Sequence, residues 1–256
     1  MNRSAFRAFR RRRRVGQRAI DVRALVDEHL DAGDPTGWFE PIYVRAGADV
    51  DAVPWAAATP HPYLTDWLDD PVVTPSGSRA VVVGCGLGDD AAELVRRGFE
   101  VTAFDVAPSA IAWAQRRFPD LDVDWRVEDV LDLSEELVGA FDLVVEVGTV
   151  TSLPGVVRDA AMDAVGRLAA PRGIVFVVTL VATDADIARD WDGPPWVQAP
   201  SELAVYRGSG LVRLALEHGE QAERGAMEVR ITWQRPKGGS PGGSAIGGPG
   251  GLPIVG

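Results

Sequence analysis

Short apolar runs that alternate with segments of helical periodicity are the feature that most limits how this chain folds. The first run, Ala80–Gly84, ends in glycine, and a helical pattern follows over Asp89–Arg97 with Gly98 as its stop. Alternation of this kind is typical of βαβ units and of a parallel sheet that is buried on both faces. Further strands are predicted at Glu100–Asp105, Val123–Val127, Phe141–Val147 and Gly173–Leu180, and further helices at Ser109–Arg117 and Gly155–Leu168.

The alternation ends in a different pattern near the C-terminus. A helical segment, Ser201–Ser209, precedes two late strands, Leu211–Glu217 and Met227–Gln234, which we expect to form a hairpin at one sheet edge. The predicted fold class is therefore α/β and Rossmann-like. It has a seven-stranded, mostly parallel sheet with an antiparallel edge hairpin and helices on both faces.

The composition divides the chain into three parts, with a main domain expected over residues 35–236. Residues 1–34 form a basic and partly disordered arm that includes a short helix near Ile20–Leu30. Residues 237–256 are rich in Gly, Pro and Ser and cannot bury enough apolar surface to fold, so they are expected to form a disordered tail. The arm is either a binding segment for RNA or an anionic membrane, a solvated extension, or sequence upstream of the true start.

The charge distribution argues against nucleic acid as a partner of the main domain. Residues 1–23 hold nine Arg and one acid, which leaves 17 of the 26 basic and 36 of the 37 acidic residues for the rest. Such an acidic body repels a phosphate backbone, so we expect a small-molecule substrate, no DNA, and RNA only if the arm binds it. One Cys fits a reducing cytoplasm, and no apolar run approaches the ~20 residues of a membrane span. We expect a cytoplasmic monomer or homodimer with no membrane contact and no metal.

A glycine loop joins the first strand to the first helix and marks the carboxyl edge of the sheet. Gly84, Gly86 and Gly88 suit a tight turn, a close approach of backbone to ligand, and close helix–strand packing, and Cys85 would contribute its backbone. Nicotinamide enzymes use a similar triplet, so the glycines alone do not identify the ligand. The pair Asp89-Asp90 follows at the helix start, where a pyrophosphate would otherwise bind. These carboxylates favour a ligand without phosphate, such as S-adenosylmethionine (SAM).

Two more acidic positions follow the next two strands. Asp105, with Val106 beside it, ends the second strand and suits a carboxylate that accepts both ribose hydroxyls. A helix N-cap or turn carboxylate is the alternative. Asp129 follows the third strand and could accept from the adenine amino group, with the backbone of Val130 nearby. Its alternative is a plain surface turn.

Glu146, at the end of the fourth strand, is the candidate catalytic residue. Substrate and cofactor meet at that edge of such a sheet. Glu146 would therefore face either the substrate or the amino group in the methionine part of SAM. The alternative is a carboxylate held by backbone N–H groups of the Gly148–Ser152 turn. Only three His are present, and His61 before Pro62 is expected to be structural.

Aromatic residues gather before the first strand and after the fifth. Trp55 is the first candidate for a contact with the sulfonium or the substrate, because an aromatic face attracts a cation. Packing of helices on the sheet is the alternative. The segment Asp190–Trp196 is a candidate lid in which Trp191 and Trp196 could stack on an acceptor, or else a rigid Pro-rich loop that packs on the domain.

These motifs resemble the class I SAM-dependent methyltransferases. The resemblance rests on Val-Gly-Cys-Gly-Leu-Gly-Asp-Asp at 83–90, Gly-Phe-Glu-Val-Thr-Ala-Phe-Asp at 98–105 and Val-Glu-Asp-Val at 127–130. It implies the family's fold, SAM as cofactor, and a methyl acceptor that carries S, O or N. The segment 141–154, with Trp55 and His61-Pro62 upstream, is similar to the thiopurine S-methyltransferase-like branch. That branch has an Asp-Arg pair where this chain has Glu146-Val147, and its Pro-Leu-Cys-Gly-Lys loop is absent here.

Three functions follow from these patterns. The first is methyl transfer to a small molecule. The second is binding of SAM or a nucleotide without turnover. The third is RNA methylation guided by the Arg-rich arm, which would make RNA binding strongly dependent on salt.

Overall fold

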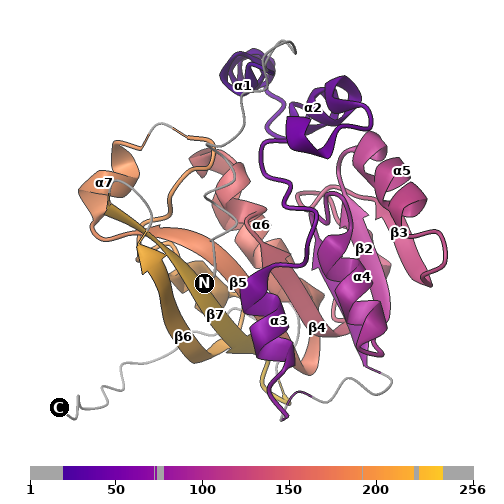
Figure 1. The fold of residues 1–256 in the computed structure, drawn as a ribbon. Helices are drawn as coiled ribbons and strands as arrows, with labels where there is room; N and C mark the ends of the chain where they lie inside the picture. Colours follow the sequence, from indigo (N-terminus) through magenta and orange to yellow (C-terminus); the bar gives the residue numbers. More distant parts are fainter. Residues whose placement is uncertain (1–19, 72, 74–77, 192, 222–224, 239–256) are drawn as a thin grey trace.

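The computed structural model describes residues 20–71, 73, 78–191, 193–221 and 225–238. They form a seven-stranded sheet in the order β3-β2-β1-β4-β5-β7-β6, with helices around it (Figure 1). Strands β1 to β5 are parallel, and β7 pairs antiparallel with both β5 and β6. The predicted fold class, including the antiparallel edge hairpin, is confirmed.

The strand predictions agree with the structure except in the length of some elements. Strands β5 and β6 are longer than the apolar runs alone indicated, because β7 pairs with both beyond the ends of those runs and β4 pairs with the start of β5. The strands are β1 (Arg79–Val83), β2 (Glu100–Asp105), β3 (Val123–Val127), β4 (Phe141–Val147), β5 (Ala169–Ala182), β6 (Val212–Gln221) and β7 (Ala226–Gln234).

The helices include the predicted ones and several short elements in the segment before β1. The α-helices are α1 (Val22–Asp31), α2 (Phe39–Ala46), α3 (Pro62–Leu68), α4 (Asp89–Arg96), α5 (Pro108–Arg117), α6 (Gly155–Leu168), α7 (Ala185–Arg189) and α8 (Ala204–Gly208). The 3₁₀ turns are η2 (Val50–Ala52), η3 (Glu135–Leu137) and η4 (Val150–Ser152). Within the described residues, none of these helices is both long and apolar enough to cross a bilayer.

The core has two layers, one on each face of the sheet. On one face, Val82 and Val145 pack with Leu64 of α3 and Leu94 of α4. On the other face, Val144 packs with residues of α6 and α8, Tyr206 among them. Burial on both faces explains why the central strands β1 and β4 are mostly apolar.

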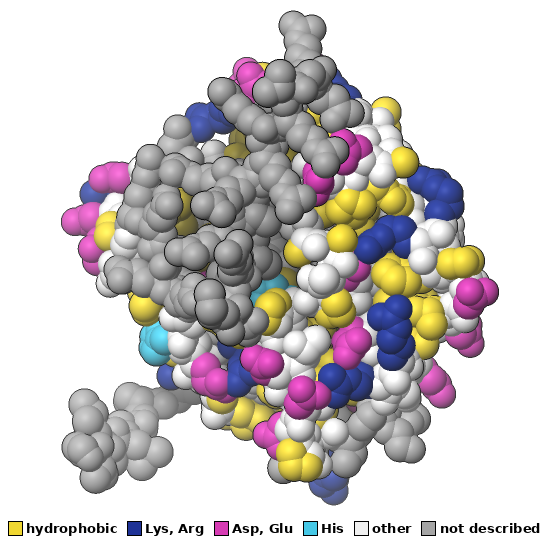
Figure 2. Space-filling model, in the orientation of Figure 1, with side chains coloured by type: hydrophobic (Ala, Val, Ile, Leu, Met, Phe, Trp, Pro, Cys, Tyr) yellow, Lys and Arg dark blue, Asp and Glu magenta, His cyan; other side chains and the backbone are white. Residues whose placement is uncertain are grey.

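The N-terminal segment lies over one end of the sheet (Figure 1). Helix α1 buries Leu25 and Val26 against Trp38 and Ile42, so this part of the expected basic arm packs on the folded body. Residues 1–19 of that arm and residues 239–256 of the expected tail lie outside the described residues. On the face seen in Figure 2, acidic and basic side chains are interspersed.

Candidate functional site

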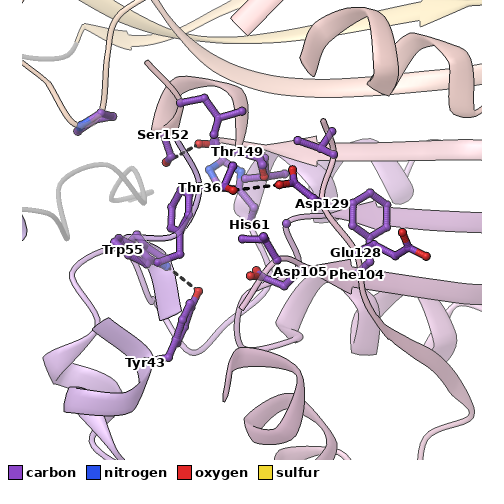
Figure 3. Close-up of a pocket in the computed structure, with 18 residues that line it drawn as sticks. Thr36, Tyr43, Trp55, His61, Phe104, Asp105, Glu128, Asp129, Thr149 and Ser152 are labelled. Atoms are coloured by element: carbon purple, nitrogen blue, oxygen red, sulfur yellow. Dashed lines mark hydrogen bonds between the residues drawn. The ribbon is translucent and has the colours of Figure 1, made fainter. Parts of the chain in front are cut away.

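A cavity opens at the carboxyl ends of the central parallel strands, where ligands bind in sheets of this kind. Gly84 follows β1, Asp105 ends β2, and Asp129 follows β3, and all three line this cavity. The predicted residues Val106, Val130 and Trp55 line it too. The structure therefore brings together residues from four separate parts of the chain (Figure 3).

The glycine loop can form only without side chains at two of its positions. Gly84 has φ +59° and Gly88 has φ +84°, in the left-handed region that L residues rarely adopt. A Cβ on Gly84 would collide with Thr149, and one on Gly88 would lie 2.6 Å from the Trp125 ring. The loop is closed by the Cys85 N–H, which donates to the Phe104 carbonyl at 2.8 Å. Cys85, Gly86 and Gly88 support the loop and do not themselves line the cavity.

Asp105 is held rigidly at the cavity wall. Its Oδ2 accepts from the Gly86 N–H and its Oδ1 from the Ala107 N–H, each at 2.9 Å. The side chain is 6% exposed, and burial raises its pKa to about 6, against the opposing effect of the two N–H donors. The carboxylate thus keeps lone pairs available to ribose hydroxyls in a geometry that is fixed in advance.

Asp129 joins the N-terminal segment to the loop after β3. Its Oδ1 accepts from the Leu131 N–H, and its Oδ2 accepts from the Thr36 hydroxyl, both at 2.9 Å. The dashed line between Thr36 and Asp129 in Figure 3 marks this second bond. Thr36 lines the cavity as well, although no sequence pattern singled it out.

The two acids at the start of α4 are already engaged with other groups. Asp89 pairs with Arg117 through two bonds of 2.6 and 2.8 Å, and Asp90 accepts from the His61 N–H at 2.7 Å. Neither lines the cavity. They still occupy the helix N-terminus, so it offers no open place for a pyrophosphate.

Glu146 is not among the residues that line the cavity, and its expected role as catalytic residue and cofactor contact stays a prediction. Its side chain is fully buried on the face of β4 that packs against α6, and Oε1 accepts from the Val150 N–H at 3.0 Å. Burial raises its pKa to about 7. The alternative interpretation, a carboxylate that anchors the turn after β4, describes what the structure contains. This turn carries Thr149 and Ser152 into the cavity wall.

An aromatic cluster from the N-terminal segment covers one side of the cavity. Trp55 Nε1 donates to the Tyr43 hydroxyl at 3.0 Å, and the two rings meet edge to face. Phe39 packs edge to face on Trp55 from the other side. Burial and the nearby Asp105 charge raise the pKa of Tyr43 well above its ordinary value, so its phenol stays neutral.

The predicted lid after β5 is held by a hydrogen bond within the loop and by packing on the rest of the protein. Trp191 Nε1 donates to the Pro195 carbonyl at 2.8 Å, and Trp196 packs against the buried cluster that contains Trp38 and does not line the cavity. Pro195 is the residue of this loop that lines the cavity. Asp192 lies outside the described residues.

His61 lines the cavity and also caps α3. Its Nδ1 accepts from the Tyr63 N–H at 3.2 Å, and its Nε2 lies 3.4 Å from Oε1 of Glu228 on β7. Both carboxylate oxygens of Glu228 are buried without a hydrogen-bond partner among the described residues. The expected structural position of His61 is correct, while its neighbour Glu228, distant in sequence, was not foreseen.

Known proteins have sequences related to part of this chain. Residues 80–173 match the model of a family described as a methyltransferase domain. A ubiquinone biosynthesis O-methyltransferase from Xanthomonas axonopodis pv. citri is 35% identical over 154 residues, which cover 54% of this chain and 64% of that protein. The chain spans about half to two thirds of the length of the curated relatives it matches, from 47% to 66%.

Solved structures share the fold. The N-methyltransferase NodS from Bradyrhizobium japonicum, in complex with S-adenosylhomocysteine (SAH), aligns with a TM-score of 0.58 and 19% identity over 77% of this chain and 98% of its own. The [4+2]-cyclase SpnF aligns with a TM-score of 0.58 and 21% identity over 84% and 93%. The sheet order, the glycine loop and the family match over residues 80–173 together resemble a SAM-dependent methyltransferase domain.

Proposed function

We propose that this protein transfers the methyl group of SAM to a small-molecule acceptor. The observation that carries the proposal is the buried Asp105 carboxylate, fixed by the Gly86 N–H at the end of β2 in a cavity shared with Gly84 and Asp129. Asp105 would accept the ribose hydroxyls and Asp129 the adenine amino group, while the backbone at Gly84 would adjoin the methionine part. When bound, SAM supplies an electrophilic methyl group.

The rest of the cavity suits an acceptor with apolar surface. Phe39, Trp55, Leu153 and Pro195 give it a largely hydrophobic wall. Methyl transfer is an in-line displacement, so a protein accelerates it chiefly by aligning the acceptor with the methyl carbon and by excluding water. Aromatic and aliphatic side chains contribute to both.

A hydroxyl oxygen is the acceptor atom that we favour. The supporting observation is the likeness to ubiquinone biosynthesis O-methyltransferases, at 35% identity over 154 residues. A thiol is the second candidate, because Trp55 and His61, which carry the resemblance to the thiopurine S-methyltransferase-like branch, both line the cavity.

Binding of SAM without methyl transfer is the alternative from another class. The likeness to SpnF, which is named a cyclase, favours keeping this alternative because one fold supports several chemistries. For its setting in the cell we propose a cytoplasmic protein, monomeric or homodimeric, that acts on small molecules rather than nucleic acids.

Transfer of a tritium-labelled methyl group from SAM tests the proposal. Hydroxyl, thiol and amine acceptors with an aromatic ring would be compared in parallel, with the Asp105→Ala variant as the matched control. We expect label in one acceptor class for the native protein and much less for the variant. SAM binding without label in any class would instead support the alternative.

A further inference from the structure

Three side chains of the segment around α2 contact the three loops that surround the expected cofactor position. Thr36 donates to Asp129 after β3 at 2.9 Å, and Glu40 accepts from the Ser109 hydroxyl at 2.6 Å and the Ser109 N–H at 3.0 Å. The third side chain, Tyr43, lies over the glycine loop after β1. A Cβ on Gly86 would be 3.2 Å from the Tyr43 hydroxyl.

The spacing of these residues matches the spacing of the strands. Glu40 and Tyr43 are three residues apart on α2, which brings their side chains to one face of the helix, and Thr36 lies in the turn just before it. From Glu40 to Tyr43 the helix rises about 4.5 Å, which is close to the spacing of about 4.8 Å between neighbouring strands. The three side chains therefore contact the loops in the order β3, β2, β1, which is the order of these strands in the sheet.

Thr36, in the turn before α2, together with Glu40 and Tyr43 on α2, is called the latch here, and it forms part of the cavity wall. Thr36 and Tyr43 both line the cavity, and Figure 3 shows them beside Asp129 and Asp105. Behind them, Asp105 and Val130 are each only 6% exposed. A molecule as large as SAM therefore reaches Asp105 most directly when the segment 36–43 moves aside.

The two hydrogen bonds that Glu40 accepts are the strongest interactions of the latch. Its carboxylate accepts two hydrogen bonds from Ser109, which lies in the first turn of α5 (Pro108–Arg117). A charged acceptor at a helix N-terminus gains from both the hydrogen bonds and the helix dipole. Ser109 itself does not line the cavity, so Glu40 holds the segment without contacting the ligand.

We propose that the latch sets the rates at which SAM enters and SAH leaves, and that Glu40 is its main positioning residue. The proposal rests on the proposed function, in that the ligand of the cavity is SAM. The latch bonds join protein atoms to protein atoms, so they hold the segment equally in the free and the occupied protein. Breaking them lowers the barrier to both entry and exit, with little change in affinity.

The test compares Glu40→Ala with Glu28→Ala, an exposed Glu→Ala change on α1 outside the latch. SAH association is followed by stopped-flow fluorescence of the native Trp residues, and SAH dissociation by release of labelled SAH into excess unlabelled SAH. Loss of charge-assisted bonds predicts both rates about 10- to 100-fold faster in Glu40→Ala. The ratio of the two rates should stay within about threefold of the native value, and Glu28→Ala should match the native protein.

Two results would overturn the latch. Unchanged rates in Glu40→Ala would show that the segment does not limit exchange. Faster dissociation alone, with affinity lost in proportion, would make Glu40 an affinity residue. If Glu40→Ala fails to fold, Ser109→Ala removes one of the two bonds and should show the same direction with a smaller change. Native protein that binds neither SAM nor SAH would refute the proposed function instead, so the two failures are distinguishable.

Discussion

The Gly86 N–H donates to the Asp105 carboxylate at 2.9 Å, and this bond ties the glycine loop after β1 to the end of β2. The same carboxylate accepts from the Ala107 N–H, so both of its oxygens are anchored by backbone. Two neighbouring strand ends thereby hold one acidic group at a fixed place in the cavity wall. Because the group is already fixed, binding loses less free energy to the ordering of the site.

Removing the Asp105 carboxylate should weaken SAM binding. Asp105→Ala loses a charged acceptor for the ribose and also frees the glycine loop, and we expect a loss of about 1–3 kcal/mol in binding free energy. Equilibrium binding of SAH measures it. Asp120→Ala, an exposed Asp→Ala change, is the control and should bind like the native protein. Equal affinities for the two variants would contradict the assignment of Asp105 to the ribose.

The affinity for SAM should also depend on the protonation of Asp105. Burial raises its pKa to about 6, and only the ionised form offers both oxygens as acceptors. Affinity should therefore fall as the pH drops through about 6 and level off above it. Asp105→Asn cannot titrate, so its weaker affinity should lack this step in a pH series of SAH titrations. A step of the same size in Asp105→Asn would assign the titration to another group.

Glu146 should destabilise the folded protein as its charge forms. Its folded pKa of about 7 lies above the ordinary value of 4.5, so the folded state retains a proton that the unfolded chain releases. This contribution to stability is complete below about pH 4.5 and is lost as the pH rises through about 7. Glu146→Gln keeps an acceptor for the Val150 N–H and stays neutral.

Urea denaturation across that pH range tests this account of Glu146. The unfolding free energy of Glu146→Gln should rise relative to the native protein between about pH 4.5 and 7, by about 1.4 kcal/mol per unit of pKa difference. Glu146→Ala, which leaves the Val150 N–H without its acceptor, should lose about 1–3 kcal/mol. A difference between Glu146→Gln and the native protein that does not vary with pH would count against a raised pKa.

His61 and Glu228 should be energetically coupled. Nε2 of His61 lies 3.4 Å from Oε1 of Glu228. Both oxygens of this buried carboxylate lack a hydrogen-bond partner among the described residues. His61→Asn keeps a capping acceptor for α3 but removes that partner, and should cost about 3 kcal/mol or more. Adding Glu228→Gln removes the buried charge and should recover part of the loss. Unfolding free energies that simply add in the double variant would exclude the coupling.

The strands and the cavity edge were predictable because they depend on local pattern and a general rule. Apolar runs located β2, β3 and β4, and the rule that parallel strands end at one edge brought Asp105 and Asp129 together. The side toward which Glu146 points was not predictable. A strand buried on both faces shows no alternation, so the sequence around Val144 and Val145 does not distinguish the cavity from the α6 side.

Contacts between segments that are far apart in the sequence could not be predicted from it either. Glu228 meets His61 only because β7 pairs with β5 and α3 packs on the same face. Glu40 and Tyr43 are three residues apart on α2 and Thr36 precedes it, but polar residues on or beside a short helix ordinarily indicate a solvated surface. Their partners become apparent once the order of the strands is known.

Isothermal titration calorimetry of the full chain with SAH, SAM and NAD tests the central claim, that the cavity binds SAM. The account predicts one SAH or SAM bound per chain, with weaker binding in Asp105→Ala and no measurable heat from NAD. Absence of binding for both SAH and SAM, or binding of NAD in their place, would contradict it.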